Sequence, residues 1–133
     1  MPLLPCWGIF SMYPFVFAKK CLTINCTDDK YVSQAFSFTE NRRHSVYVSK
    51  PYLSSDDHVL IVDDFLAESE ATHALIDIVH QAGATLAGIG IAIEKGYQKG
   101  GRLLRDEGYR VESIAIIKEM DIKTQSFKFI DQE

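Results

Sequence analysis

Two adjacent carboxylates, Asp63 and Asp64, follow the apolar run Val59–Val62, and a helical pattern begins a few residues later. A short continuous apolar run is typical of a strand that is buried on both faces of a sheet. Carboxylates at the end of such a strand can hold sugar hydroxyls or a divalent cation, and the free N–H groups of a helix start bind phosphate. Residues 58–72 therefore predict a site for a phosphorylated sugar.

Two other interpretations of the acid pair remain. The pair could be a solvated strand end without a ligand. A strand ending in two aspartates is also typical of response-regulator receivers, which hold Mg²⁺ there. A receiver needs a phosphoacceptor aspartate at the end of a later strand, but the next strand ends in Glu94 and Lys95. The receiver interpretation is therefore the weaker one.

The elements around the acids alternate between strand and helix patterns. Apolar residues at helical spacing predict a helix over 71–82, with Ser69 as its N-cap and Gly83 as its end. Further strands are predicted at 86–93 and 110–117, a helix at 97–107 that stops at Gly108, and a last strand near 127–129. The order β-α-β-α-β predicts an α/β fold with a parallel sheet. Upstream, residues 32–38 and 46–48 predict an inserted β-hairpin.

Composition narrows the class of protein. The 133 residues suffice for a single domain, and the formal net charge of −4 offers no basic excess for nucleic acid. The three cysteines lack metal-ligand spacing, and we expect reduced thiols and a cytoplasmic protein.

The first 18 residues are apolar but unlike a membrane segment. No basic residue precedes the run, and three prolines interrupt it. We therefore expect no membrane anchor, although an anchor or signal remains an alternative. The other interpretation makes 15–18 a core strand behind an atypical start over 1–13.

Longer stretches of the sequence resemble the type I phosphoribosyltransferases. The resemblance covers residues 14–130, with these segments: 15–20, the hairpin with 36–39, 54–66, 81–84, 87–91, 93–95 and 108–113. It implies a Rossmann-like parallel-sheet core and the transfer of ribose 5-phosphate from phosphoribosyl pyrophosphate to a purine, with xanthine as the expected base, in purine salvage. Mg²⁺ would arrive with phosphoribosyl pyrophosphate, and a homodimer is expected.

The resemblance also assigns roles to residues. Asp63 and Asp64 would contact the ribose hydroxyls as the catalytic pair. Lys95 would donate to an exocyclic purine oxygen, and Tyr97 would stack on the base. Lys19 and Lys20 would form the basic end of the strand before a catalytic loop. The residues expected to form the loop around the 5′-phosphate are Ala67, Glu68, Ser69, Glu70 and Ala71.

Two departures from the family pattern predict reduced or absent transferase activity. Ser69 stands where the family has a glycine, and Glu68 and Glu70 flank it with charges that repel a phosphate. In addition, only residues 1–13 precede the strand expected at 15–18, so the core is expected to be N-terminally incomplete. The unit expected to be missing is the first βα unit, with its pyrophosphate loop. A non-catalytic purine- or phosphoribosyl-binding relative is the alternative function.

Overall fold

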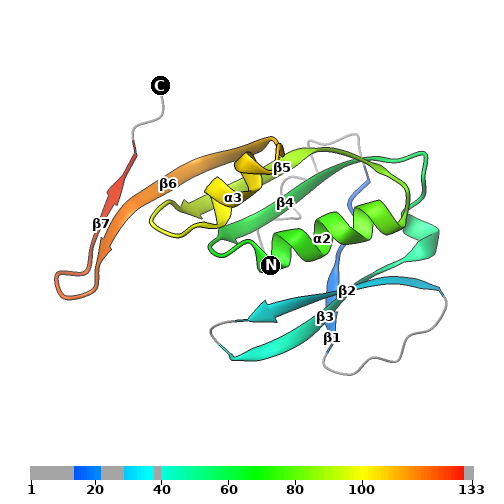
Figure 1. Cartoon of the computed structure of the whole chain (residues 1–133), viewed down its shortest axis with the longest axis horizontal. Coiled ribbons are helices and arrows are strands. Elements are labelled where there is room, and N and C mark those ends of the chain that lie inside the picture. The colour runs from blue at the N-terminus through cyan, green and yellow to red at the C-terminus, as the bar shows by residue number, and fades with distance from the viewer. Residues whose placement is uncertain (1–13, 22–28, 38–39, 131–133) are drawn as a thin grey trace.

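The computed structural model describes residues 14–21, 29–37 and 40–130, and the account below concerns these residues. They form two sheets with a helix packed between them (Figure 1). The smaller sheet has the order β1-β3-β2, and the larger has the order β4-β5-β6-β7. Strands β4, β5 and β6 run parallel, and β7 is antiparallel to β6. The α/β class and the parallel core predicted from the sequence are thus confirmed.

The predicted hairpin is present and longer than expected. Strand β2 (Lys30–Ser37) pairs antiparallel with β3 (Arg42–Ser49) along its whole length. The short strand β1 (Lys19–Cys21) pairs with the other edge of β3. A 3₁₀ turn, η1 (Lys50–Tyr52), then leads toward the larger sheet.

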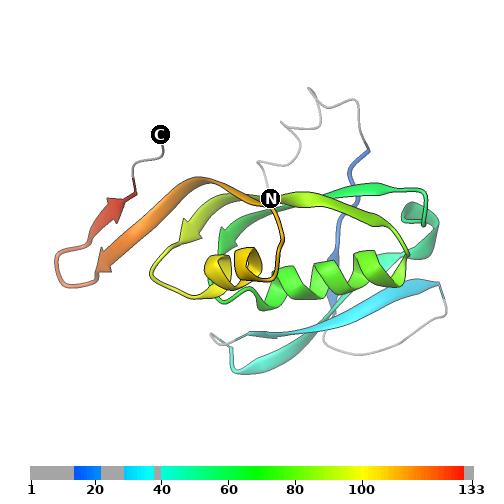
Figure 2. The same cartoon turned by 45° about the horizontal axis from the view of Figure 1, so that its top comes forward.

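The strands of the larger sheet extend beyond the apolar runs that predicted them. They are β4 (His58–Leu66), β5 (Thr85–Lys95), β6 (Val111–Asp121) and β7 (Ser126–Phe129). The last strand was predicted from the alternation of Phe127 and Phe129, and it is confirmed. Together with the end of β6 it projects away from the rest of the sheet (Figure 2).

Helix α2 (Glu70–Gln81) joins the two sheets because its apolar side chains lie on two faces. Ile76 and Val79 pack with the parallel sheet, whereas Ala74 and Ile78 pack with the hairpin. Glycine ends the helix as predicted, since Gly83 has a φ of 72° in the left-handed region that disfavours other residues. Helix α3 (Gly100–Asp106) starts three residues later than predicted and adds the fully buried Leu104 to the same core.

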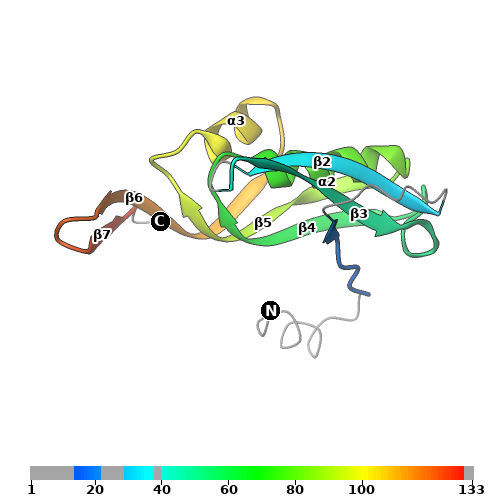
Figure 3. The same ribbon diagram turned by 90° about the horizontal axis from the view of Figure 1, so that it is seen from below.

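Both helices cover the same face of the parallel sheet (Figure 3). The prediction that residues 59–62 are buried on both faces is therefore wrong. Ile61 is buried against the helices, but Leu60 and Val62 are 60% and 52% exposed. A continuous apolar run shows only that both faces of the strand carry apolar side chains. It does not indicate whether other elements cover both faces.

The prediction of a core strand at 15–18 is also wrong. Residues 14–18 form no strand, Phe15, Val16 and Phe17 are exposed, and pairing begins only at Lys19. The expected atypical start over 1–13 lies outside the described residues. Neither helix in the described part of the chain is long and apolar enough to cross a membrane.

Candidate functional site

The acid pair lies inside β4 rather than after it. Asp63 is paired in register with Ile91 of β5, and the strand continues to Leu66. The sequence prediction placed the strand end at Val62, because the apolar run stops there. The backbone N–H of Asp64 donates to Asp63 Oδ1 at 2.9 Å, and the N–H of Phe65 donates to Asp64 Oδ1 at 2.8 Å. Each carboxylate thus accepts a hydrogen bond from the backbone N–H of the next residue, and these bonds hold both side chains close to the strand.

Burial raises the pKa of Asp63 to about 6. The side chain of Asp64 adds to the rise, while the backbone N–H of Asp64 and the positive charge of Lys20 oppose it. Lys19 and Lys20 begin β1 rather than end a strand, so the predicted basic strand end is wrong, but Lys20 does come within electrostatic range of the acid pair. The pKa of Asp63 is therefore close to neutral pH, where its carboxyl can gain or lose a proton.

Replacing Asp63 with asparagine is expected to stabilise the fold at high pH. The pKa of Asp63 is about 6 in the folded chain against an ordinary 3.8. The native carboxyl therefore favours folding when the pH is below the ordinary pKa, where it is protonated. That contribution is lost as the pH rises through the folded value, and an asparagine does not titrate. We expect the effect of Asp63→Asn on the free energy of unfolding to be about 1 to 2 kcal/mol more stabilising at about pH 8 than at about pH 4. This range allows for solvent screening. Urea unfolding of both chains at the two pH values measures this, and a difference independent of pH would contradict it.

Residues 67–69 link β4 to α2 and form the predicted phosphate loop, which continues into Glu70 and Ala71 of the helix. Ser69 is buried and has a φ of 70° and a ψ of 1°, a left-handed conformation that strains any residue except glycine. Its side chain makes no capping bond to α2. The predicted side-chain cap is therefore wrong, because an N-cap oxygen reaches the helix amides from the β region of backbone conformation.

Backbone contacts hold the loop in this strained shape. The N–H of Gly100 donates to the carbonyl oxygen of Ala67 at 2.9 Å, and the N–H of His73 donates to that of Ser69 at 2.8 Å. The His73 ring also contacts this Ser69 oxygen through Nδ1 at 2.9 Å, while its Nε2 lies 2.7 Å from Glu107 Oε2. Helix α3 and its C-terminal flank therefore support the loop from outside it.

The charges beside the loop oppose an anion. Glu70 is the exposed first residue of α2, where a carboxylate suits the helix dipole. Glu68 lies 3.7 Å from the Lys99 ammonium, and its side chain is 30% exposed. The first-turn amides of α2 offer donors to a phosphate, but the two carboxylates raise the electrostatic cost of placing one there.

Lys95 and Tyr97 lie at the same edge of the sheet as the loop. Leu66 pairs with Glu94, so Lys95 at the end of β5 comes level with Ala67 at the start of the loop. Tyr97 lies in the turn before α3 and is 43% exposed, which leaves its ring available to a ligand. The alternative that Tyr97 is a core residue at a helix start is not supported, because α3 begins only at Gly100.

Sequence reasoning missed the charged network beside this edge. Glu94 is 4% exposed and forms a bidentate pair with Arg105. The available signal was an acid placed directly after the apolar residues of β5. The described residues contain no group of three or more histidine, cysteine, aspartate or glutamate side chains placed to hold a metal ion.

Comparisons with known proteins show what the sequence and the structure of the chain are similar to. No family model matches the chain. It is 50% identical over 120 residues to a xanthine phosphoribosyltransferase of Bifidobacterium adolescentis, a match covering 90% of this chain and 62% of that protein. It is 54% identical over 111 residues to one from Finegoldia magna, covering 84% of this chain and 58% of that protein. The chain thus spans less than two thirds of the length of these curated relatives.

Solved structures agree on the fold. The adenine phosphoribosyltransferase of Rhodothermus marinus superposes with a TM-score of 0.70 at 19% identity, over 86% of this chain and 62% of that one. The chain is therefore similar to curated bacterial xanthine phosphoribosyltransferases over most of its own length, and it has the fold of the phosphoribosyltransferase structure on which it superposes.

Proposed function

We propose that the protein is a xanthine phosphoribosyltransferase, which transfers ribose 5-phosphate from phosphoribosyl pyrophosphate to xanthine and yields xanthosine monophosphate for purine salvage. The observation that carries this proposal is the 50% identity to a curated xanthine phosphoribosyltransferase over 90% of the chain. The acid pair at the C-terminal end of β4 and the lysine at the end of β5 lie within that stretch and support it.

The proposed roles divide the site into three parts. Asp63 and Asp64 accept hydrogen bonds from the ribose hydroxyls. The backbone amides over 67–71 surround the 5′-phosphate, because the first N–H groups of a helix have no partner within the helix. Lys95 donates to an exocyclic oxygen of xanthine, and Tyr97 stacks on its ring.

The reaction exchanges one bond at the anomeric carbon for another. The bond from C1′ of the ribose to pyrophosphate breaks, a bond from C1′ to a purine nitrogen forms, and that nitrogen loses its proton. Positive charge develops on the ribose between these events, and the nearby carboxylates of Asp63 and Asp64 would stabilise it. Asp63, with a pKa of about 6, would be mostly ionised above neutral pH. Catalysis would otherwise depend on positioning of the two substrates.

Mg²⁺ enters this proposal as part of the substrate. It would arrive bound to the pyrophosphate and assist its departure. Two adjacent carboxylates suit such a shared ion better than a resident one, which takes more protein oxygens. A cytoplasmic location and a homodimer complete the proposal, and the resemblance to the family supports both.

A second candidate function is a purine- or phosphoribosyl-binding relative without chemistry. The phosphate loop favours it, since Ser69 holds a strained conformation and Glu68 and Glu70 flank it with negative charge. These features weaken the part of the site that must hold the 5′-phosphate.

Calorimetric titration of the purified chain with phosphoribosyl pyrophosphate and Mg²⁺, followed by an assay for xanthosine monophosphate, separates the two candidates. Binding near micromolar with turnover of xanthine supports the transferase. The same binding without turnover supports the second candidate. A folded chain that binds neither phosphoribosyl pyrophosphate nor xanthine would contradict both.

A further inference from the structure

The buried carboxylate of Glu94 directly precedes Lys95, the lysine proposed to bind the purine base. Glu94 Oε1 accepts a hydrogen bond from Arg105 Nη1 at 2.7 Å, and Oε2 accepts one from Nη2 at 2.8 Å. The Ser113 hydroxyl donates to Oε2 at 2.5 Å. The carboxylate therefore joins the ends of β5 and α3 to β6, and Arg105 fixes its orientation through two parallel bonds.

The first turn of α3 fits between this carboxylate and the phosphate loop. A Cβ on Gly101 would collide with Glu94 Oε1, so the carboxylate occupies space that only a glycine leaves open. A Cβ on Gly100 would collide with the carbonyl oxygen of Ala67 and lie 2.7 Å from the nitrogen of Ser69. The two glycines thus bring the helix backbone against Glu94 on one side and the loop on the other.

Helix α3 has few other anchors. It has seven residues, too few to be stable alone, and Leu104 is its one buried large side chain. Arg102 and Leu103 are exposed, and Lys99 meets Glu68 at the surface. Besides the packing of Leu104, polar contacts therefore hold the helix in place: the bonds of Arg105 to Glu94, the bond of Gly100 to Ala67 and, at its C-terminal flank, the contact of Glu107 with His73.

We infer that Glu94 is a positioning residue, which holds α3 against residues 67–69 through Arg105 and thereby sets the shape of the phosphate loop. The contact of Gly100 with Ala67 transmits the effect to the loop. The identity of the ligand that this loop binds rests on the proposed function, whereas the role of Glu94 in placing the loop does not.

A positioning role explains why an ion pair is found at this point. The Arg105 side chain is 39% exposed, and ion pairs that reach the surface usually add little to stability, so stability alone does not explain the pair. Apolar contacts tolerate small shifts, whereas a bidentate pair fixes direction and distance. The Arg105 guanidinium holds the pKa of Glu94 below its ordinary value despite burial, and Glu94 raises that of Arg105. Both groups therefore remain charged over the physiological range.

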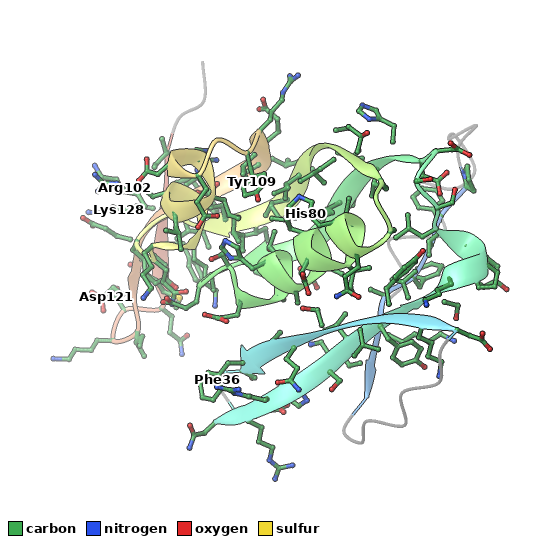
Figure 4. The ribbon with its side chains drawn as sticks, turned by 45° about the vertical axis from the view of Figure 1, so that its right-hand side comes forward. Phe36, His80, Arg102, Tyr109, Asp121 and Lys128 are labelled. Atoms are coloured by element: carbon green, nitrogen blue, oxygen red, sulfur yellow. The ribbon has the colours of Figure 1, made fainter. Side chains whose placement is uncertain are left out.

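The test uses Glu94→Gln and Arg105→Lys, with Arg102→Lys as the matched control. Arg102 lies on the outer side of α3 (Figure 4). Its side chain is 88% exposed. Amide exchange measured by NMR reports the Gly100 N–H, which donates to Ala67. We expect it to exchange about fivefold faster or more in both test variants and unchanged in the control. The amide of Ala82, bonded to Ile78 in α2, should keep its native exchange.

The outcomes separate positioning from general stability. If Gly100 and Ala82 lose protection together, Glu94 serves only global stability and the inference is wrong. If neither changes, the inference is also wrong. Should Glu94→Gln fail to fold, Arg105→Lys decides, because it keeps the charge and loses only the bidentate geometry. Titration with phosphoribosyl pyrophosphate and Mg²⁺ should show about fivefold weaker binding in the test variants. If the native chain binds none, the proposed function fails while the exchange result still decides the role of Glu94.

Discussion

Replacing Glu68 and Glu70 together with glutamine is expected to raise the affinity for phosphoribosyl pyrophosphate about tenfold or more. One unit charge repels another by about 1 kcal/mol at 4 Å in water and by about 4 kcal/mol at an effective dielectric near 20. A 5′-phosphate at the start of α2 would meet two such carboxylates. The change also releases Lys99 from Glu68, 3.7 Å away, so that its ammonium becomes free to approach the phosphate.

Calorimetric titration with phosphoribosyl pyrophosphate and Mg²⁺ measures this effect. The control is Asp56→Asn with Glu119→Gln, which removes the same charge from exposed positions outside the site. It separates local repulsion from the effect of removing two negative charges from a chain whose formal net charge is −4. If the two double variants bind equally, the carboxylates do not face the phosphate and the acidic loop is no obstacle. A small loss of helix stability is expected, because Glu70 suits the dipole of α2.

Gly100→Ala is expected to lower the free energy of unfolding by about 3 kcal/mol, the upper end of the usual cost of overpacking. The added methyl group would collide with the carbonyl oxygen of Ala67 and lie 2.7 Å from the nitrogen of Ser69. Both atoms are backbone and belong to the strained loop, so they cannot rotate away as a side chain would. The better helix propensity of alanine offsets only about 1 kcal/mol of this cost.

The control for this prediction is Gly90→Ala. The nearest atom to a Cβ on Gly90 is the carbonyl oxygen of Ile61 at 3.9 Å, an ordinary contact. Its unfolding free energy should change by less than about 1 kcal/mol. Urea unfolding of the three chains gives both values. Equal stability of the two variants would show that α3 moves away from the loop without cost, and it would remove the steric basis of the inference about Glu94.

Much of the fold could be predicted because it is encoded in local patterns. The apolar runs at β4 and β5 and the helical spacing of α2 give the parallel order, since a crossover helix between strands leaves few alternatives. Gly83 and Gly108 were predicted as helix ends, and both have positive φ values, 72° and 94°. These features depend on a few neighbouring residues, so the sequence alone carries them.

The site was predicted less completely. The sequence singled out Asp63 and Asp64 as candidates, but their place within β4 depends on pairing with β5, which a single segment cannot reveal. The left-handed conformation of Ser69 occurs in a loop that α3, about thirty residues further along the chain, contacts through the bond of Gly100 to Ala67, and no local pattern reveals that contact. The assigned roles in binding sugar, phosphate and base stay predictions.

The sequence by itself determined the type and order of the strands and helices, the acid pair and its relation to phosphoribosyltransferases. Only the tertiary structure decided that one face of the parallel sheet carries both helices, that residues 15–17 are exposed, and that Glu94 pairs with Arg105. The physical reason is the range of the interactions. Periodicity and backbone preference act over a few residues, whereas burial, ion pairing and steric contact depend on which distant segments meet.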